Sequence, residues 1–445
     1  MRDALLLGTL ALCLLLALRR PYVGVLVWAW FALMTPHQMA YGAYGVPLNA
    51  VIAGVTIVAL ILNGEYRRFR FDRTTALLLL LAFWLTISQV FSLDAKNSAL
   101  YYDRFIKLLV FVLICVQTTT DKLRFHALVW MFVVSIGFFA MKGAAFTIVT
   151  LGQFHVQGPP NTVMEDNNHL GIIMATSLPM ILYLRAEAAN KLVRLGLLIL
   201  FAATMLAILG TQSRGAFVSL IAFAGFFWLR SKHKLSIAAG LFLLLTPAIA
   251  FMPEKWSTRM ETITSATEDA SFMGRVDAWI INTKLAVKHP ITGAGLRNSY
   301  QKEIAATVDR DRADHAKAAH SIYFELLGGA GFIGLAIYLS LLATAFFTAL
   351  SFQRRSGDPA LAAWAPRFGY FAQMSLVVFG VGGATVSLEM WDGYLLLVAL
   401  IAALPTLAVA DDASTARIKS PHRLRWRVAA RGHAAQGPRP SLLER

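Results

Sequence analysis

The chain has 445 residues, of which 57% are hydrophobic and only 15% are charged, and its formal net charge is +16. Soluble domains carry about 25% charged residues, so this composition excludes an ordinary soluble protein. The basic residues lie in short loops and near the C-terminal end without a recognisable nucleic-acid module, so we expect no binding to nucleic acid. Cys13 and Cys115 both fall within apolar runs, which argues against a disulfide framework in the loops.

Apolar runs follow one another along the whole chain, and with their flanks they approach the length of about 20 residues that crosses a membrane as a helix. We predict an all-α, polytopic membrane protein of about 12 or 13 transmembrane helices. The first two runs are short and can form two spans, one hairpin or one re-entrant element. Arg19, Arg20 and Pro21 follow the first run without a clear cleavage site, so we expect it to be retained. The predicted spans are residues 4–18, 22–35, 48–63, 74–91, 107–119, 126–150, 168–185, 195–210, 215–230, 235–252, 321–350, 366–385 and 393–410.

Clusters of Lys and Arg predict the orientation in the membrane. They lie between alternate spans, in residues 64–73, 186–194, 230–234 and 351–359, and again in the C-terminal tail. Cytoplasmic loops retain such residues, so we place these segments in the cytoplasm. We predict four parts: N-terminal transmembrane helices in 1–252, a large periplasmic loop in 253–320, C-terminal transmembrane helices in 321–410, and a basic cytoplasmic tail in 411–445, disordered or bound to the membrane surface.

The opposite side receives residues 92–104, 153–169, 211–214 and the long loop 253–320. Within the long loop, residues 281–288 and 299–319 are predicted to be helical, and Pro290, Gly293 and Gly295 break the chain between them. Candidate functional residues should be sought on this periplasmic side.

Arg214 and Arg275 are the first candidates. Arg214 lies in Thr-Gln-Ser-Arg-Gly between two apolar runs, and an arginine at a membrane boundary is costly unless it snorkels to water, faces a cavity or pairs with an anion. Arg275 lies in a polar loop, in Gly-Arg-Val-Asp-Ala-Trp, where simple solvation is the alternative. Guanidinium groups bind phosphates in a bidentate way, so two converging arginines would hold a pyrophosphate.

His320 opens the run His-Ser-Ile-Tyr-Phe-Glu at the start of a predicted membrane helix. A histidine there can act as a base near neutral pH, and a structural hydrogen bond at the helix start is the alternative. Tyr323 follows within the first turn, and His315 is a second candidate that resembles a solvated loop residue. The histidines of this region lack the spacing of a zinc site, so we predict no metal.

Two further polar clusters face the same side. Residues 158–169 include Asn167 and Asn168 just before an apolar run, and helix capping accounts for only part of this cluster. Arg104 ends a similar cluster, Tyr-Tyr-Asp-Arg. No Walker A, dinucleotide-binding or nucleophile-elbow motif is present. An enzyme acting outside the cytoplasm must therefore use an activated substrate that the membrane delivers.

These motifs resemble those of the O-antigen ligase and polymerase superfamily. The His320 run resembles the pattern His-Asn/Ser-x-Tyr-Leu with Gly-x-x-Gly after it, and residues 211–215 resemble the family's Ser-Arg-Gly turn. Residues 274–295 resemble its Gly-Arg…Trp…His-Pro…Gly-x-Gly stretch. The elements occur in family order, and the resemblance covers roughly residues 70–405. Ser321 stands where the family more often has Asn.

The resemblance implies an inner-membrane glycosyltransferase with its active site facing the periplasm. It would move a glycan from undecaprenyl diphosphate to an acceptor hydroxyl of lipid A–core oligosaccharide, without metal, nucleotide or other cofactor. Arg214 and Arg275 would bind the diphosphate, and His320 would activate the hydroxyl. We add Arg104, Asn167, Asn168, His315 and Tyr323 as candidate substrate-binding residues.

Three other functions remain open at this point. A polymerase would use a second lipid-linked glycan as the acceptor. Residues 158–168 resemble a subgroup of O-glycosylation ligases associated with exosortase systems, which would modify a protein. A lipid or polysaccharide transporter would instead carry charged residues and broken helices at mid-membrane.

Overall fold

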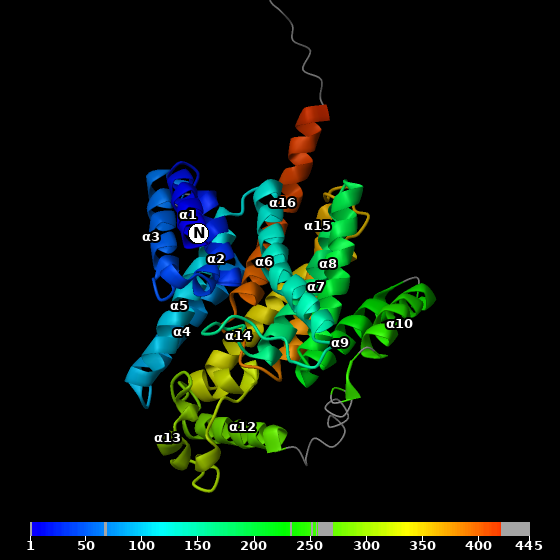
Figure 1. The fold of residues 1–445 in the computed structure, drawn as a ribbon. Coiled ribbons are helices and arrows are strands. Elements are labelled where there is room, and N and C mark those ends of the chain that lie inside the picture. Colours follow the sequence, from blue (N-terminus) through cyan, green and yellow to red (C-terminus); the bar gives the residue numbers. More distant parts are fainter. Residues whose placement is uncertain are drawn as a thin grey trace, which may run out of the picture.

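Each predicted span coincides with a helix of the computed structural model (Figure 1). The structure describes residues 2–65, 69–231, 234–250, 252–254, 256 and 270–419. Arg67, Arg68 and the tail beyond Lys419 lie outside the described residues. The helices of the bundle are α1 (Arg2–Arg19), α2 (Pro21–Met34), α3 (Leu48–Leu62), α4 (Arg73–Val90), α5 (Ala95–Thr118), α6 (Lys122–Val149), α7 (Asn167–Glu187), α8 (Lys191–Gly210), α9 (Arg214–Arg230), α10 (Lys234–Ala250), α14 (Ile322–Arg354), α15 (Trp364–Gly383) and α16 (Asp392–Lys419).

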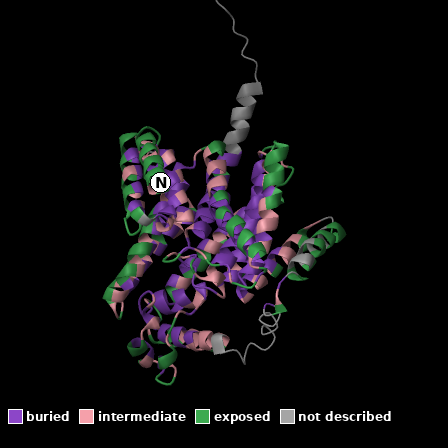
Figure 2. Cartoon of the chain, in the orientation of Figure 1, coloured by how far each residue is buried: buried purple, intermediate pink, exposed green. Residues whose placement is uncertain are grey.

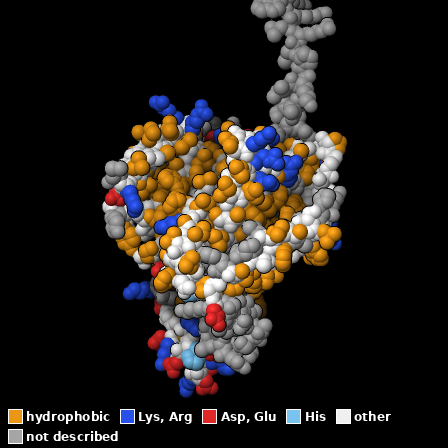
Figure 3. Space-filling view, turned by 45° about the vertical axis from the view of Figure 1, so that its right-hand side comes forward, with side chains coloured by type: hydrophobic (Ala, Val, Ile, Leu, Met, Phe, Trp, Pro, Cys, Tyr) orange, Lys and Arg blue, Asp and Glu red, His pale blue; other side chains and the backbone are white. Residues whose placement is uncertain are grey.

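The composition of these helices fits a multi-pass membrane protein. Among the described residues, α4, α6, α7, α8 and α14 are long and apolar enough to cross a membrane, and α2, α3 and the first part of α16 are shorter apolar helices. Figure 3 shows hydrophobic side chains covering the bundle, with Lys and Arg gathered at its upper end and charges of both signs on the lower part. The all-α, polytopic class is therefore confirmed.

The centre of the bundle is built on α7, α14 and α15, which pack against one another. Nearly every side chain of α7 from Leu170 to Leu184 is buried, and Figure 2 shows the buried residues concentrated in the middle of the molecule. Because α7 is apolar on all sides, other helices can surround it and bury nearly all of its side chains. The outer helices α1, α3 and α8 leave many of their side chains exposed.

Segments predicted to share a side of the membrane are linked. Arg230 donates to Gln353 Oε1 at 3.1 Å, which joins two of the basic loops. At the other end, Leu93 N–H donates to the Ala294 carbonyl at 3.0 Å, and Gln212 donates to the Gly152 carbonyl at 2.8 Å. The predicted periplasmic segments therefore meet at one end of the bundle.

The long loop crosses beneath the bundle as α12 (Ala270–Lys288) and α13 (Lys302–Ala306), with short 3-10 turns at Asn298–Tyr300 and Ala313–His315 (Figure 1). The prediction of one helix over residues 299–319 was wrong. Thr307 Oγ1 donates to the Ile304 carbonyl at 2.7 Å, and Asp309 Oδ1 accepts Arg312 N–H at 3.2 Å. Such side-chain bonds to the backbone compete with helix propagation.

Three other boundaries differ from the predictions. Helix α12 begins well before residue 281, and α5 begins at Ala95, so Arg104 lies inside a helix where we had expected a loop. Asp94 caps α5 by accepting Asn97 N–H at 3.0 Å, which lets the helix extend outward beyond its apolar part. Helix α16 continues to Lys419, past Asp411 where we had placed the start of the tail.

Helix α14 is interrupted where the long loop packs on it. Gly331 has φ 72° and ψ −175°, which breaks the helical conformation. Ala294 and Gly295 donate backbone hydrogen bonds to the carbonyls of Gly328 and Gly329 at 2.8 and 3.0 Å. A Cβ atom at Gly293 would lie 2.5 Å from the Gly331 nitrogen. The glycines on both sides therefore allow the two backbones to approach closely.

Candidate active site

His320 lies one residue before the cap of α14 in an unusual backbone conformation. Its φ is +46°, a left-handed value that a side chain with a Cβ rarely adopts. The backbone of the preceding residue, Ala319, is held at both its N–H and its carbonyl. Ala319 N–H donates to Glu325 Oε1 at 2.8 Å, and Trp279 Nε1 donates to the Ala319 carbonyl at 2.7 Å. Trp279 in turn stacks on Phe324, with ring centroids 5.2 Å apart.

The imidazole of His320 faces a basic, largely dry environment. Its ring centroid lies 6.5 Å from that of His169 on α7. Burial, followed by the charges of Arg275 and His169, lowers the pKa of His320 from 6.5 to about 4, and Lys317 acts in the same direction. His320 is therefore uncharged at neutral pH. Its Nδ1 atom is buried and has no partner among the described residues.

Arg275 reaches the site from the first part of α12. Its Nη1 atom donates to the Thr385 carbonyl at 3.3 Å, in the turn between α15 and α16. Beside it, Gly274 lies against the end of the Lys317 side chain, where a Cβ atom would overlap. Helix α12 thus brings Arg275 towards the segment that ends in His320, and that segment adds a second cation, Lys317.

The turn that carries Arg214 adjoins the same Thr385. Arg214 is the first residue of α9, and a Cβ atom at Gly215 would overlap the Thr385 side chain. Two asparagines at the start of α7 fix this turn. Asn167 Nδ2 donates to the Thr211 carbonyl at 2.7 Å, and Asn168 Oδ1 accepts the Ser213 hydroxyl at 2.8 Å. Both arginine-bearing segments therefore reach the turn between α15 and α16.

A family model described as O-antigen ligase matches residues 196–339, which include Arg214, Arg275 and His320. This part of the chain belongs to the O-antigen ligase superfamily. Residues 1–189 match a family of unknown function (DUF5935). Among curated proteins, none matches the chain.

Two candidate substrate-binding residues of the O-antigen ligase segment contact other parts of the protein. His315 Nδ1 lies 2.9 Å from Asp277 Oδ2, and its side chain is 62% exposed. The Tyr323 hydroxyl donates to the Gly380 carbonyl on α15 at 2.7 Å. Arg104 belongs to the N-terminal region, where it lines a separate cavity. Substrate contact by these residues, and by Asn167 and Asn168, remains a prediction.

A buried charged cluster beside the O-antigen ligase motifs was missed at the sequence level. Arg297 Nη2 pairs with Glu389 Oε1 at 3.0 Å, and Glu389 is 1% exposed. Burial would lower the pKa of Arg297, but Glu389 beside it raises that pKa above its ordinary value. Glu325 Oε1 also accepts the hydroxyls of Tyr300 and Ser387 at 2.7 and 2.6 Å. One signal in the sequence was Glu389 itself, an acid between Leu388 and Met390.

Several buried polar atoms of the histidine pair and of the charged cluster lack a hydrogen-bond partner among the described residues. They are His169 Nε2, Arg297 Nε, Glu325 Oε2 and Glu389 Oε2, in addition to His320 Nδ1. Buried polar atoms normally find a partner in the protein, in water or in a ligand. His320, with the guanidinium of Arg275 near it, therefore lies in a part of the protein that has spare hydrogen-bonding capacity for a polar substrate.

Proposed function

We propose that the protein transfers a glycan from undecaprenyl diphosphate to a hydroxyl group of lipid A–core oligosaccharide, at the periplasmic face of a bacterial inner membrane. The observation that carries the proposal is that Arg275 and the turn of Arg214 both reach Thr385, while the charge of Arg275 lowers the pKa of His320; all three residues belong to the O-antigen ligase segment. A base and a fixed cation are the two groups that this transfer needs.

In the proposed reaction, the acceptor oxygen attacks the anomeric carbon of the donor sugar. The bond between that carbon and the diphosphate oxygen breaks, and the electron pair leaves with the diphosphate. His320 takes the proton of the attacking hydroxyl, and Arg275 and Arg214 bind the growing negative charge. Diphosphate bound at Arg275 also offsets the charge that lowers the pKa of His320, so donor binding makes His320 a stronger base. Direct displacement inverts the anomeric configuration.

An apolar groove next to His320 suits the polyprenyl chain of the donor. It has a volume of about 430 Å³ and runs between α14 and α15 from Tyr323, which is three residues after His320. Leu339, Leu342, Phe346 and Phe347 line it. A lipid-linked diphosphate could place its chain in this groove and its charged end at the arginines.

The test is transfer of lipid-linked glycan to lipid A–core by purified protein. We expect His320→Ala, Arg214→Ala and Arg275→Ala each to abolish transfer while expression remains normal. Arg355→Ala is the matched control, because Arg355 pairs with Asp358 in a basic loop at the other end of the bundle. Wild-type transfer by any two of the three variants would disprove the site.

The choice of acceptor is tested in the same assay. A polymerase would extend the glycan on a second lipid-linked molecule, and a protein O-glycosylation ligase would label an acceptor protein. Labelling of either one in place of lipid A–core would replace the proposed acceptor and leave the donor chemistry unchanged.

A further inference from the structure

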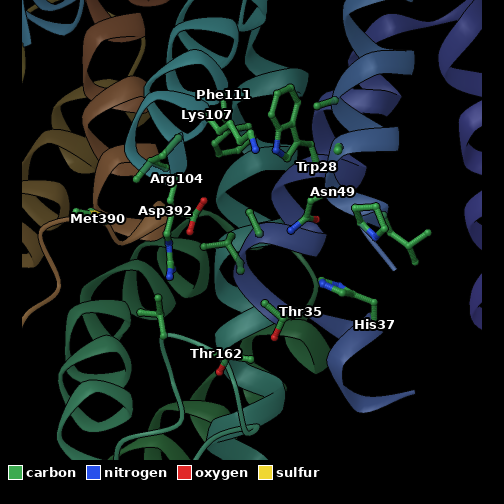
Figure 4. A pocket seen from close by; sticks show the side chains of 18 of the residues that line it. Trp28, Thr35, His37, Asn49, Arg104, Lys107, Phe111, Thr162, Met390 and Asp392 are labelled. Carbon is green, nitrogen blue, oxygen red and sulfur yellow. The ribbon is translucent and has the colours of Figure 1, made fainter. Parts of the chain in front are cut away.

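A second cavity lies in the N-terminal region, between α2, α3 and α5 (Figure 4). Its volume is about 780 Å³, which is within the range of small-molecule sites. Most of its wall is apolar and includes Trp28, Leu33, Ile57 and Phe111. Residues 161–164 and 390–392 also line it.

This cavity reaches the surface of the bundle that faces lipid. Ile57 on α3 and Val110 on α5 line it and are 37% and 38% exposed. Gly54 also lines it, and a Cβ atom there would meet no other atom within 4 Å. Helix α3 packs on α1 and α2, which leaves its side toward α5 free to form the opening.

The polar groups of the cavity have mixed charge. Arg104 and Asp392 lie at one end and His37 at the other, with Asn49 between them (Figure 4). Lys107 pairs with Asp103 at 2.6 Å. A diphosphate requires unopposed cations, whereas these cations are accompanied by carboxylates. Paired donors and acceptors of this kind fit the hydroxyl groups of a sugar better than a diphosphate.

Two residues of the cavity lining, Val163 and Met390, connect it to the region of His320 and the buried charged cluster. The Val163 carbonyl, whose residue lines the cavity, accepts His169 Nδ1–H at 2.9 Å. The ring of His169 then faces His320 with centroids 6.5 Å apart. Met390, also a lining residue, directly follows Glu389 of the buried charged cluster. The lining of the cavity therefore connects through Val163 and His169 to the proposed base.

We propose that this cavity binds the lipid-anchored acceptor. One of its acyl chains enters between α3 and α5, and its sugar reaches the end marked by Arg104 and Asp392. The inference rests on the proposed function, and it separates the acceptor from the donor, whose chain is assigned to the groove at Tyr323. It also gives residues 1–189 a role, because most of the lining residues belong to that region.

Photo-crosslinking tests binding directly. Ala53, a lining residue, is replaced by p-benzoylphenylalanine in the full-length protein, and radiolabelled lipid A–core is the probe. We expect a crosslink that unlabelled lipid A–core suppresses and that undecaprenyl diphosphate-linked glycan does not. The same photoreactive residue at Gly225 is the control, because that position on α9 also opens onto free space. Equal labelling at both positions, or suppression by the donor alone, would overturn the proposal.

Kinetics provide a second readout with a matched pair of variants. Gly54→Phe adds a ring at the opening of the cavity, where a Cβ atom meets no other atom within 4 Å, and Gly225→Phe adds the same side chain elsewhere. We expect Gly54→Phe to raise the acceptor KM by about tenfold or more and to leave the donor KM unchanged, since only one binding step is affected. An unchanged acceptor KM would refute acceptor binding here, even with transfer intact. Absence of transfer by the wild-type protein would instead count against the proposed function.

Discussion

Glu325 accepts the backbone N–H of Ala319 at 2.8 Å, and so holds the residue that immediately precedes His320. The same carboxylate oxygen accepts two hydroxyls, from Tyr300 and Ser387. Because His320 has a left-handed φ of 46°, its position depends on contacts that keep this conformation. Glu325 is therefore a positioning residue for the proposed base.

Replacing Glu325 tests this role. Glu325→Ala leaves three donors without their acceptor, at a cost of about 1–3 kcal/mol each. We expect kcat for transfer to fall at least about tenfold, with little change in the acceptor KM, since binding and positioning are separate. Glu325→Gln, which keeps an accepting oxygen, should restore part of kcat, and Ser387→Ala should have a small effect. Transfer at the wild-type rate by Glu325→Ala would contradict the assignment.

The pH dependence of transfer should show the lowered pKa of His320. The folded protein holds this pKa near 4, below the ordinary 6.5, so it binds fewer protons than the unfolded chain between these values. The free energy of unfolding should therefore decrease as pH falls from 6.5 towards 4. We expect kcat/KM to stay high at pH 6 and to fall only near pH 4 to 5, because the pH dependence of kcat/KM reports the pKa of the base in the free enzyme.

Lys317→Met tests whether the charge of Lys317 contributes to the lowered pKa of His320. Lys317 lowers the pKa of His320, so its removal should move the acid limb of kcat/KM towards higher pH. Lys191→Met, on an exposed residue at the start of α8, is the control and should leave the profile in place. An acid limb that Lys317→Met does not move would show that the charge of Lys317 does not act on the titrating base.

The Arg297–Glu389 pair should show strong coupling in stability. Arg297→Met leaves the carboxylate of Glu389 buried without its 3.0 Å partner, a change that costs about 3–5 kcal/mol. The double variant Arg297→Met/Glu389→Leu removes both charges and should unfold at a higher temperature than Arg297→Met alone. The unfolding temperatures of the two variants are compared in detergent by fluorescence-detected size exclusion. Additive losses in the double variant would argue against a coupled pair.

Gly331 should not tolerate a side chain. Its φ is 72°, and a Cβ atom would overlap the Ile291 carbonyl. We expect Gly331→Ala to lower the unfolding temperature and to reduce transfer, because α14 and the long loop can no longer approach each other. Gly196→Ala is the control, since its Cβ would meet nothing within 4 Å and alanine favours the helix. Equal unfolding temperatures for both variants would contradict the close approach.

The sequence was sufficient to predict the helices, because long apolar runs have few alternatives in a membrane. It was less informative where polar residues continue a helix. Helix α5 extends outward through Lys96, Asp103 and Arg104, which hydrophobicity alone does not predict. In the long loop, the bonds made by Thr307 and Asp309 end a helix that propensity favoured.

For the site, local motifs identified His320, Arg214 and Arg275, but not their surroundings. His169 faces His320 although 151 positions separate them in the chain, and 92 positions separate Arg297 from Glu389. No spacing rule relates residues so far apart, since their contact depends on how α7, α14 and α16 pack. Glu325 was visible in the run after His320, but its bond to the Ala319 backbone follows only from the reversed conformation at His320.

The pairing of residues 294–295 with 328–329 also sets an order for biogenesis. The amide groups of Ala294 and Gly295 leave the ribosome before the carbonyls of Gly328 and Gly329 that they bind. The long loop can therefore form these two bonds only after residues 328–329 have been synthesised, and a nascent chain that stops before them lacks the acceptors that hold residues 294–295 on α14.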